Sequence, residues 1–260
     1  MKNRAKTFVA VLALLTLVPA YGQGRGGMGM GGAPRGPELS GAMAKLFGNN
    51  PSFTATMEMQ MSGMPQGQGI TMLTKMAFDN GNSRVELDMS QLKGPQMNPE
   101  MASHMKSMGM EKIVTITLKD KNAKYLIYPG LKGYVEMPNR DPEVSKPESD
   151  FKVEMTELGK ETVEGHPCVK NKATVTDKEG KKYESLVWNA TDMKNFPIKI
   201  ETTDQGHTST ILFKDVTFSK SDAALFQPPA DFKKYDDQTS LMMEAMKGMQ
   251  HGMGGMPGGQ

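Results

Sequence analysis

The clearest pattern in the chain is a strict alternation of apolar and polar residues between positions 52 and 61. The apolar positions share one side, and serine, threonine, glutamate and glutamine share the other; the apolar set is Phe53, Ala55, Met57, Met59 and Met61. Successive side chains of a strand point to opposite faces, so this period of two predicts a half-buried β-strand. The buried face of that strand should belong to a core rich in methionine.

Two further strands follow, joined by a tight turn. The apolar positions of the first are Ile70, Met72, Met76 and Phe78, and those of the second are Val85, Leu87 and Met89. Asn80 and Gly81 lie between them. An Asn-Gly pair favours a two-residue hairpin turn, because both central residues of that turn need positive φ. The pattern therefore predicts an antiparallel hairpin with a second methionine-rich face.

The alternation continues through the rest of the chain. Strands are expected at 114–118, 125–128, 133–137, 151–163, 167–176, 181–190, 196–203 and 207–218, with turns rich in Gly, Asp and Asn between them. Long strands joined by tight turns form an antiparallel meander, in which strands that follow one another along the chain should pair. About ten such strands close into a barrel or curl around a core.

Short helices interrupt the strands. The first has an apolar face made of Leu39, Met43, Leu46 and Phe47, and Gly48 can end it in a left-handed conformation. A second helix is expected between residues 92 and 111, where Asn98 suits the N-cap and Pro99 the first helical turn. Its methionines are spaced by four, four and three residues and form one stripe: Met97, Met101, Met105 and Met108. A third helix, at 239–250, repeats this stripe with Met242, Met246 and Met249.

The N-terminus predicts export. Basic residues at positions 2, 4 and 6 precede an apolar stretch at 8–18, and Ala20-Tyr21-Gly22 supplies the small-x-small pattern of a cleavage site. We therefore expect a Sec-type signal peptide at 1–22, a Gly/Met-rich flexible leader at 23–38, one domain at 39–235 and a Met/Gly-rich tail at 236–260. No cysteine follows the cleavage site, and no later segment has the roughly 20 apolar residues of a spanning helix. No lipid anchor and no integral membrane segment are expected after cleavage.

Charge and composition exclude several classes of function. Removing the three basic residues of the signal leaves 28 basic and 29 acidic residues, a balance that gives no basis for nucleic-acid binding. The single cysteine cannot form an internal disulfide, so the fold must be held by its core. The unusual number is methionine, with 25 of 260 residues.

No pattern of catalytic residues stands out. Cys168, His166 and His207 have no nucleophile elbow or oxyanion loop around them. The glycines at 24–32 neither follow a strand nor precede a helix, so they do not suit a phosphate-binding loop. We expect a protein that is not an enzyme and needs no cofactor.

Three segments of the C-terminal half resemble a known superfamily. They are GKETVEGHPC at 159–168, LVWNA at 186–190 followed by FPIKI at 196–200, and ALFQPPADFKK at 224–234. Their order and spacing are similar to those of the LolA/LppX-like lipoprotein carrier superfamily. The resemblance is closest to its uncharacterised relatives, described only as domains of unknown function.

The resemblance implies a mainly β fold, in which a strongly curved antiparallel sheet makes an incomplete barrel with short helices plugging its open side. It implies a periplasmic protein that holds a lipid or a lipoprotein acyl chain in the concave face. Methionine is flexible and polarizable, and it suits apolar ligands of varied shape. The residues expected to line the cavity and its lid are Phe53, Met57, Met59, Met61, Met72, Met76, Phe78, Met89, Met101, Met105 and Met108.

Three other interpretations stay open. The same methionines can be ordinary core residues. Thioethers are also soft ligands that select Cu(I), and a copper-binding segment would use Met242, Met246, Met249, His251 and Met253. Finally, the domain can be a non-catalytic envelope protein that docks to a partner.

Overall fold

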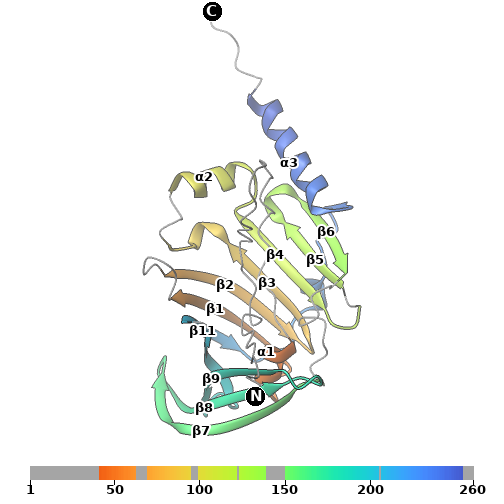
Figure 1. The fold of residues 1–260 in the computed structure, drawn as a ribbon. Coiled ribbons are helices and arrows are strands. Elements are labelled where there is room, and N and C mark those ends of the chain that lie inside the picture. The colour runs from red at the N-terminus through yellow and green to blue at the C-terminus, as the bar shows by residue number, and fades with distance from the viewer. Residues whose placement is uncertain are drawn as a thin grey trace, which may run out of the picture.

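A computed structural model describes residues 41–62, 69–94, 99–121, 123–138, 150–204 and 206–253. The segments predicted as signal peptide and leader lie outside this part of the chain, as do Leu39, Met97, Asn98 and the residues after 253. The described residues form one curved sheet with short helices at its ends and on its concave side (Figure 1). The mainly β fold predicted from the alternation is therefore confirmed.

The expected elements are present with small shifts at their ends. The helices are α1 (Gly41–Leu46), α2 (Pro99–Ser107) and α3 (Gln238–Met253), with short 3-10 turns η2 (Met89–Gln91), η3 (Pro129–Leu131) and η5 (Ala223–Phe226). The strands of the first half are β1 (Ser52–Ser62), β2 (Ile70–Asp79), β3 (Asn82–Asp88), β4 (Lys112–Leu118), β5 (Ala123–Tyr128) and β6 (Gly133–Pro138). Those of the second half are β7 (Lys152–Val163), β8 (His166–Thr176), β9 (Lys182–Ala190), β10 (Phe196–Asp204), β11 (His207–Thr217) and β12 (Lys233–Tyr235).

The hairpin of β2 and β3 forms where the Asn-Gly pair predicted it. Asn80 and Gly81 have φ of 50° and 90°, and Asp79 faces Asn82 across the turn. Positive φ at both central residues gives the turn a twist that matches the flanking strands. The register of the hairpin is thereby fixed, and the methionines of β2 fall on the same face as those of β1.

The expectation that strands pair in chain order is wrong at one point. β6 and β7 do not pair; instead β1 pairs with β11, and the sheet order is β12-β6-β5-β4-β3-β2-β1-β11-β10-β9-β8-β7. Two meanders are thus joined at the middle of the sheet, where Met57 faces Phe213. The methionine-rich strand β1 is therefore hydrogen-bonded along both edges, to β2 on one side and to β11 on the other. β12 lies parallel to β6, and β7 forms the other edge, so the sheet stays open.

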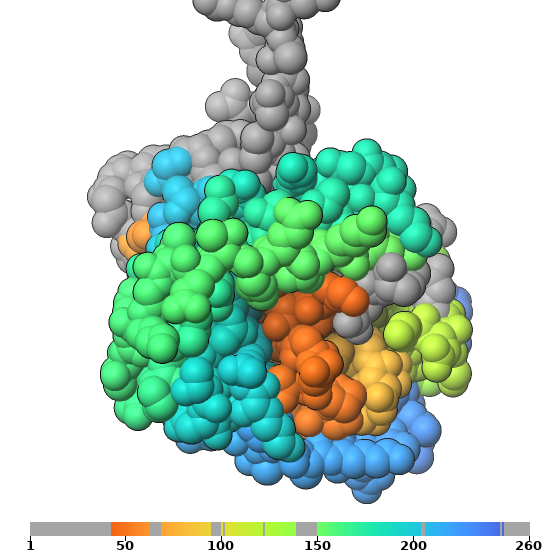
Figure 2. Space-filling model, turned by 90° about the horizontal axis from the view of Figure 1, so that it is seen from below, coloured from red at the N-terminus to blue at the C-terminus, as the bar shows by residue number. Residues whose placement is uncertain are grey.

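The main core fills the concave side of the sheet, and α1 is its plug. Phe47, just after α1, has ring centroids at 4.7 Å from Phe53, 5.3 Å from Phe78 and 5.8 Å from both Phe196 and Phe213. These partners come from strands on both sides of the β1–β11 pair. Seen from below, the orange segment that contains α1 lies between the green strands of the second half and the yellow strands of the first (Figure 2). α1 therefore links the two meanders through aromatic contacts.

The convex face is apolar in two places. One cluster, around β4, includes Val114, Ile116 and Phe226, the last from η5. The other includes Cys168, Trp188 and Ile198. The segment after β11 thus crosses the outside of the sheet and covers β4, so β4 is buried on both faces. Among the described residues, no helix is long and apolar enough to cross a membrane.

Candidate functional site

An unbroken apolar row crosses the concave face of five strands. Direct cross-strand neighbours from β2 to β9 are Met72, Met59, Ile211, Ile200 and Val187. Each of these side chains is at most 3% exposed. Opposed apolar pairs stabilise a sheet. Here they also form a continuous apolar strip along its curved concave face.

Most of the residues expected to line the cavity lie in the single cluster that contains this row. Phe53, Met57, Met59, Met72, Met76, Phe78, Met89 and Met105 are buried together in it, and Met61 packs against it at the rim. Met108 is half-buried, and the side chain of Met101 is outside the described part of the structure. The sequence thus placed these residues on one face; their role in holding a ligand stays a prediction.

Two buried hydroxyls lie on β4, two strands beyond the Met72 end of the apolar row, at the level of Met76 and Phe78 of β2. Thr115 and Thr117 of β4 are 2% and 7% exposed, and neither side-chain oxygen has a hydrogen-bond partner among the described residues. Thr115 faces Val85 and Leu126, both members of the concave cluster, so these hydroxyls point to the concave side. A buried hydroxyl without a partner costs free energy, which makes it a natural contact for a polar group of a ligand. Sequence analysis missed both, although they alternate with the apolar residues of β4.

The first turn of α3 closes the β6 end of the core. Leu241 is buried, and the side-chain amide of Gln238 donates a hydrogen bond to the phenol oxygen of Tyr128 at 2.8 Å. Burial raises the pKa of Tyr128 to about 12. Gly133 is required beneath this turn, because a Cβ there would lie 2.9 Å from the Tyr235 ring and 3.3 Å from Leu241.

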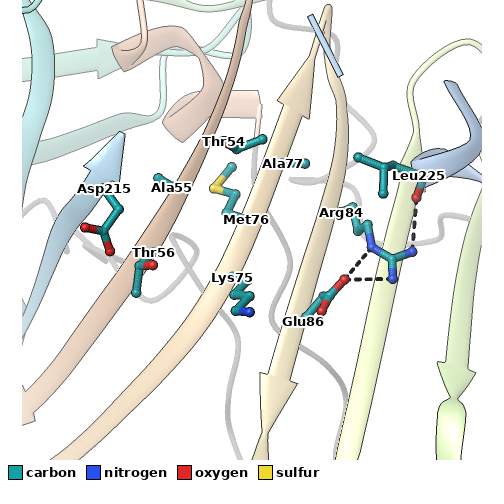
Figure 3. Close-up of a pocket in the computed structure, with 10 residues that line it drawn as sticks. All are labelled: Thr54, Ala55, Thr56, Lys75, Met76, Ala77, Arg84, Glu86, Asp215 and Leu225. Carbon is teal, nitrogen blue, oxygen red and sulfur yellow. Dashed lines mark hydrogen bonds and ion pairs between the residues drawn. The ribbon is translucent and has the colours of Figure 1, made fainter. Parts of the chain in front are cut away.

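A groove of about 270 Å³, lined by both charged and apolar side chains, lies on the opposite, convex face (Figure 3). It runs from Asp215 on β11 across β1 and β2 to Arg84 and Glu86 on β3. The Arg84 guanidinium donates to Glu86 at 2.7 Å and to the carbonyl of Leu225 at 3.1 Å. A neighbouring cavity of about 430 Å³ shares Thr56, Lys75, Arg84 and Glu86 with this groove and extends to β4. The groove contains both acidic and basic groups, namely Asp215, Lys75, Arg84 and Glu86.

The histidine and cysteine of β8 show no arrangement for nucleophilic catalysis. His166 Nδ1 lies 2.8 Å from the Asp192 carboxylate, and the Cys168 thiol donates to the carbonyl of His166 at 3.3 Å. Burial raises the pKa of the Cys168 thiol, which disfavours the reactive thiolate. Among the described residues, no group of three or more His, Cys, Asp or Glu side chains could hold a metal ion.

The methionines of the tail differ in exposure. Met242 packs partly against the core, whereas Met243 and Met246 are 54% and 42% exposed. The backbone of α3 continues through Met249, His251 and Met253, whose side chains are outside the described part. The candidate copper ligands are therefore placed on one helix without being shown to converge.

Comparison with known families assigns the chain to one of them. Residues 53–195, more than half of the chain, match the family described as Domain of unknown function (DUF4412). The chain belongs to this family. The match begins in β1 and ends just before β10, so it contains most of the methionine-rich strands. No curated protein matches the chain.

Several solved structures are similar to this one, at low sequence identity. A LolA superfamily protein from Nitrosomonas europaea shares 9% identity, with 73% of this chain and 98% of that chain covered and a TM-score of 0.38. A putative outer membrane lipoprotein-sorting protein domain from Vibrio parahaemolyticus shares 14% identity, with coverages of 72% and 93% and a TM-score of 0.32. The Mycobacterium tuberculosis lipoprotein LppX shares 8% identity, with coverages of 70% and 93% and a TM-score of 0.31. The first and the third carry the names LolA and LppX, after which the superfamily that the C-terminal motifs resemble is called.

Proposed function

We propose that this protein is an exported, periplasmic binding or carrier protein that holds a lipid or a lipoprotein acyl chain in the concave face of its sheet. The observation that carries the proposal is the apolar row from Met72 to Val187, which crosses five strands of an open sheet. An extended acyl chain laid along this row would contact apolar side chains over its whole length.

The concave side is filled in the structure, so a ligand would have to displace side chains. Methionine has three rotatable bonds and loses little packing when it adopts another rotamer, which lowers the cost of making room. Met57, Met59, Met72 and Met76 lie at the centre of the core, where this property matters most. Burial of an acyl chain would return about 25 cal/mol per Å² of apolar area removed from water, without any charged anchor.

The hydroxyls of Thr115 and Thr117 support a ligand with a polar end. Both are buried on the concave side of β4, two strands beyond the Met72 end of the apolar row, and both can donate and accept a hydrogen bond. An ester or amide carbonyl of a lipid would satisfy a hydroxyl that has no partner among the described residues. The proposed ligand is therefore a chain with a polar group near one end, rather than a hydrocarbon alone.

Native mass spectrometry of the mature protein, purified from its own periplasm without detergent, tests the proposal. We expect an added mass that organic extraction removes and that fragmentation identifies as a lipid or acyl chain. Met57→Leu and Met72→Leu should retain this mass, because volume and hydrophobicity are kept. A bare polypeptide mass would contradict the proposal and favour the alternative of docking to an envelope partner.

A second candidate function is Cu(I) binding by the tail, which the exposure of the Met246 thioether favours. Met246→Leu, Met249→Leu and Met253→Leu together should abolish Cu(I) binding while keeping the helix apolar. Retention of a chelator-sensitive copper mass by this variant would contradict the candidate. Loss of the lipid mass in the same variant would instead contradict the assignment of the lipid to the concave face.

A further inference from the structure

The apolar stripe of α3 continues beyond the domain that buries its first turn. Leu241 is buried and Met242 is packed partly against the core. Met243 and Met246, one and four positions after Met242, are about half exposed. Figure 1 shows α3 leaving the sheet beside β6 and extending away from it. The methionine spacing runs on in the sequence to Met249 and Met253. The root of the helix is therefore anchored while its outer part presents methionine outside the domain.

The charge and length of α3 limit what can cover these methionines. The 16 residues include one Glu, one Lys and one His, so the helix has almost no net charge and no basic face for anionic surfaces. At 1.5 Å per residue it is about 24 Å long, which is shorter than the roughly 30 Å hydrocarbon core of a bilayer. Such a helix can lie in a membrane interface but cannot span the membrane.

The exposed methionine area of α3 favours a bilayer over a groove of another protein as its partner. Among the described side chains of α3, the exposed methionines Met243 and Met246 together present far less surface than the about 800 Å² per partner of a standard protein interface. A fluid bilayer requires neither that area nor shape complementarity, and a few inserted apolar side chains give weak, reversible attachment. Methionine, being unbranched and flexible, suits disordered acyl chains.

We propose that α3 is a membrane-contacting helix whose exposed methionines insert into the interface of a phospholipid bilayer. The anchored first turn, held by Leu241 and by the bond from Gln238 to Tyr128, fixes the rest of the domain beside the lipid surface. This membrane contact is separate from the lipid site on the concave face. In a carrier of acyl chains it would hold that site close to a membrane.

Flotation of the mature full-length protein with phosphatidylcholine vesicles tests the proposal. The wild type should float with the vesicles, and Met243→Gln with Met246→Gln should lower the bound fraction at least fivefold. The control carries Met155→Gln and Leu158→Gln on the edge strand β7, where the side chains are 42% and 53% exposed, nearly matching the α3 pair. This control should bind as the wild type does.

The proposal is overturned if the wild type does not float, if the α3 variant floats as well as the wild type, or if the β7 control loses as much binding as the α3 variant. Binding that needs phosphatidylglycerol and disappears in high salt would also overturn it, since the attachment would then be electrostatic. The co-purified mass is measured on the same samples. If the α3 variant loses flotation but keeps its lipid mass, the membrane contact of α3 and the lipid site on the concave face are independent. If the protein floats but carries no lipid mass, only the proposed lipid site is contradicted.

Discussion

Gln238 at the start of α3 and Tyr128 at the end of β5 are joined by a hydrogen bond of 2.8 Å between the side-chain amide and the phenol oxygen. The two residues are 110 positions apart in the chain. Tyr128 is fully buried in the concave cluster, so its hydroxyl would have no solvent to replace this partner. The bond therefore ties the tail helix to the core at a point where the loss of one partner leaves the other unsatisfied.

Tyr128→Phe should loosen the root of α3 with little effect on the sheet. The ring is kept and only the hydroxyl is lost, so we expect a decrease of about 1 kcal/mol in the free energy of unfolding. Hydrogen exchange should accelerate in 238–246 and stay unchanged in β1 and β11. Gln238→Leu should cost more than Tyr128→Phe, because it leaves the buried phenol oxygen without a partner. Equal exchange rates in the wild type and both variants would contradict the proposed tie.

Alkaline pH should destabilise the protein through Tyr128. The pKa of a tyrosine in an unfolded chain is near 10, and burial raises the pKa of Tyr128 to about 12. The folded state therefore holds this proton more tightly, and the resulting stabilisation is complete below pH 10 and lost as the pH rises toward 12. Two pKa units correspond to about 2–3 kcal/mol. Because pH 11 lies midway between the two pKa values, urea unfolding at pH 9 and pH 11 should show about half of this loss, about 1.4 kcal/mol, in the wild type. Tyr128→Phe should show a clearly smaller loss.

Phe47→Ala should be among the most destabilising single substitutions. The ring contacts four phenylalanines from β1, β2, β10 and β11, and its loss leaves a cavity where the two meanders meet. Deletion of a buried phenylalanine ring costs about 3–5 kcal/mol. Phe218→Ala is the matched control, since Phe218 is half-buried and packs on Phe196 at 5.6 Å. Denaturant unfolding should give the control less than half of the loss caused by Phe47→Ala.

Local patterns predicted the strands and the methionine face, because each depends on residues within one turn or strand. The period of two at 52–61 gave β1, and the Asn80-Gly81 pair gave the β2–β3 hairpin. The pairing of β1 with β11 could not be found this way, since nothing in either strand specifies a partner about 150 residues away. For the same reason the family resemblance, rather than periodicity, was needed to expect an open, curved sheet.

The burial of the convex face of β4 could not be predicted from the sequence pattern either. Val114, Ile116 and Leu118 alternate with Thr115 and Thr117 along the strand and share a face, but alternation does not say which face that is. Phe226 buries them on the convex side, which leaves Thr115 and Thr117 to face the core. The hydroxyls of the candidate site are consequences of a contact between β4 and a segment more than 100 residues away.

Gly81→Ala tests how strongly the hairpin turn depends on its backbone conformation. The φ of Gly81 is +90°, where an L side chain is strained by about 1–2 kcal/mol, and a new Cβ would meet the Lys119 side chain. Gly180→Ala is the matched control, because φ is +82° there and no atom lies within 4 Å of the added Cβ. Lys119 can swing aside, so both variants should lose about the same stability in urea unfolding. A much larger loss at Gly81 that Lys119→Ala relieves would show that the lysine stem is fixed.

Thr115→Val and Thr117→Val distinguish a ligand contact from an ordinary core position. Valine keeps the shape of threonine and removes a buried hydroxyl that has no partner among the described residues, so the ligand-free protein should gain about 1 kcal/mol in each variant. If the hydroxyls hold the polar end of a lipid, the same variants should retain less co-purified lipid and release it faster to acceptor vesicles. Thr74→Val is the matched control, since Thr74 is buried on the same face but donates to the carbonyl of Met57 at 3.3 Å. Thr74→Val should lower stability by removing a hydrogen bond that exists, while leaving lipid retention unchanged. A gain in stability with unaltered lipid retention at Thr115 and Thr117 would remove both residues from the binding site and confine it to the apolar row.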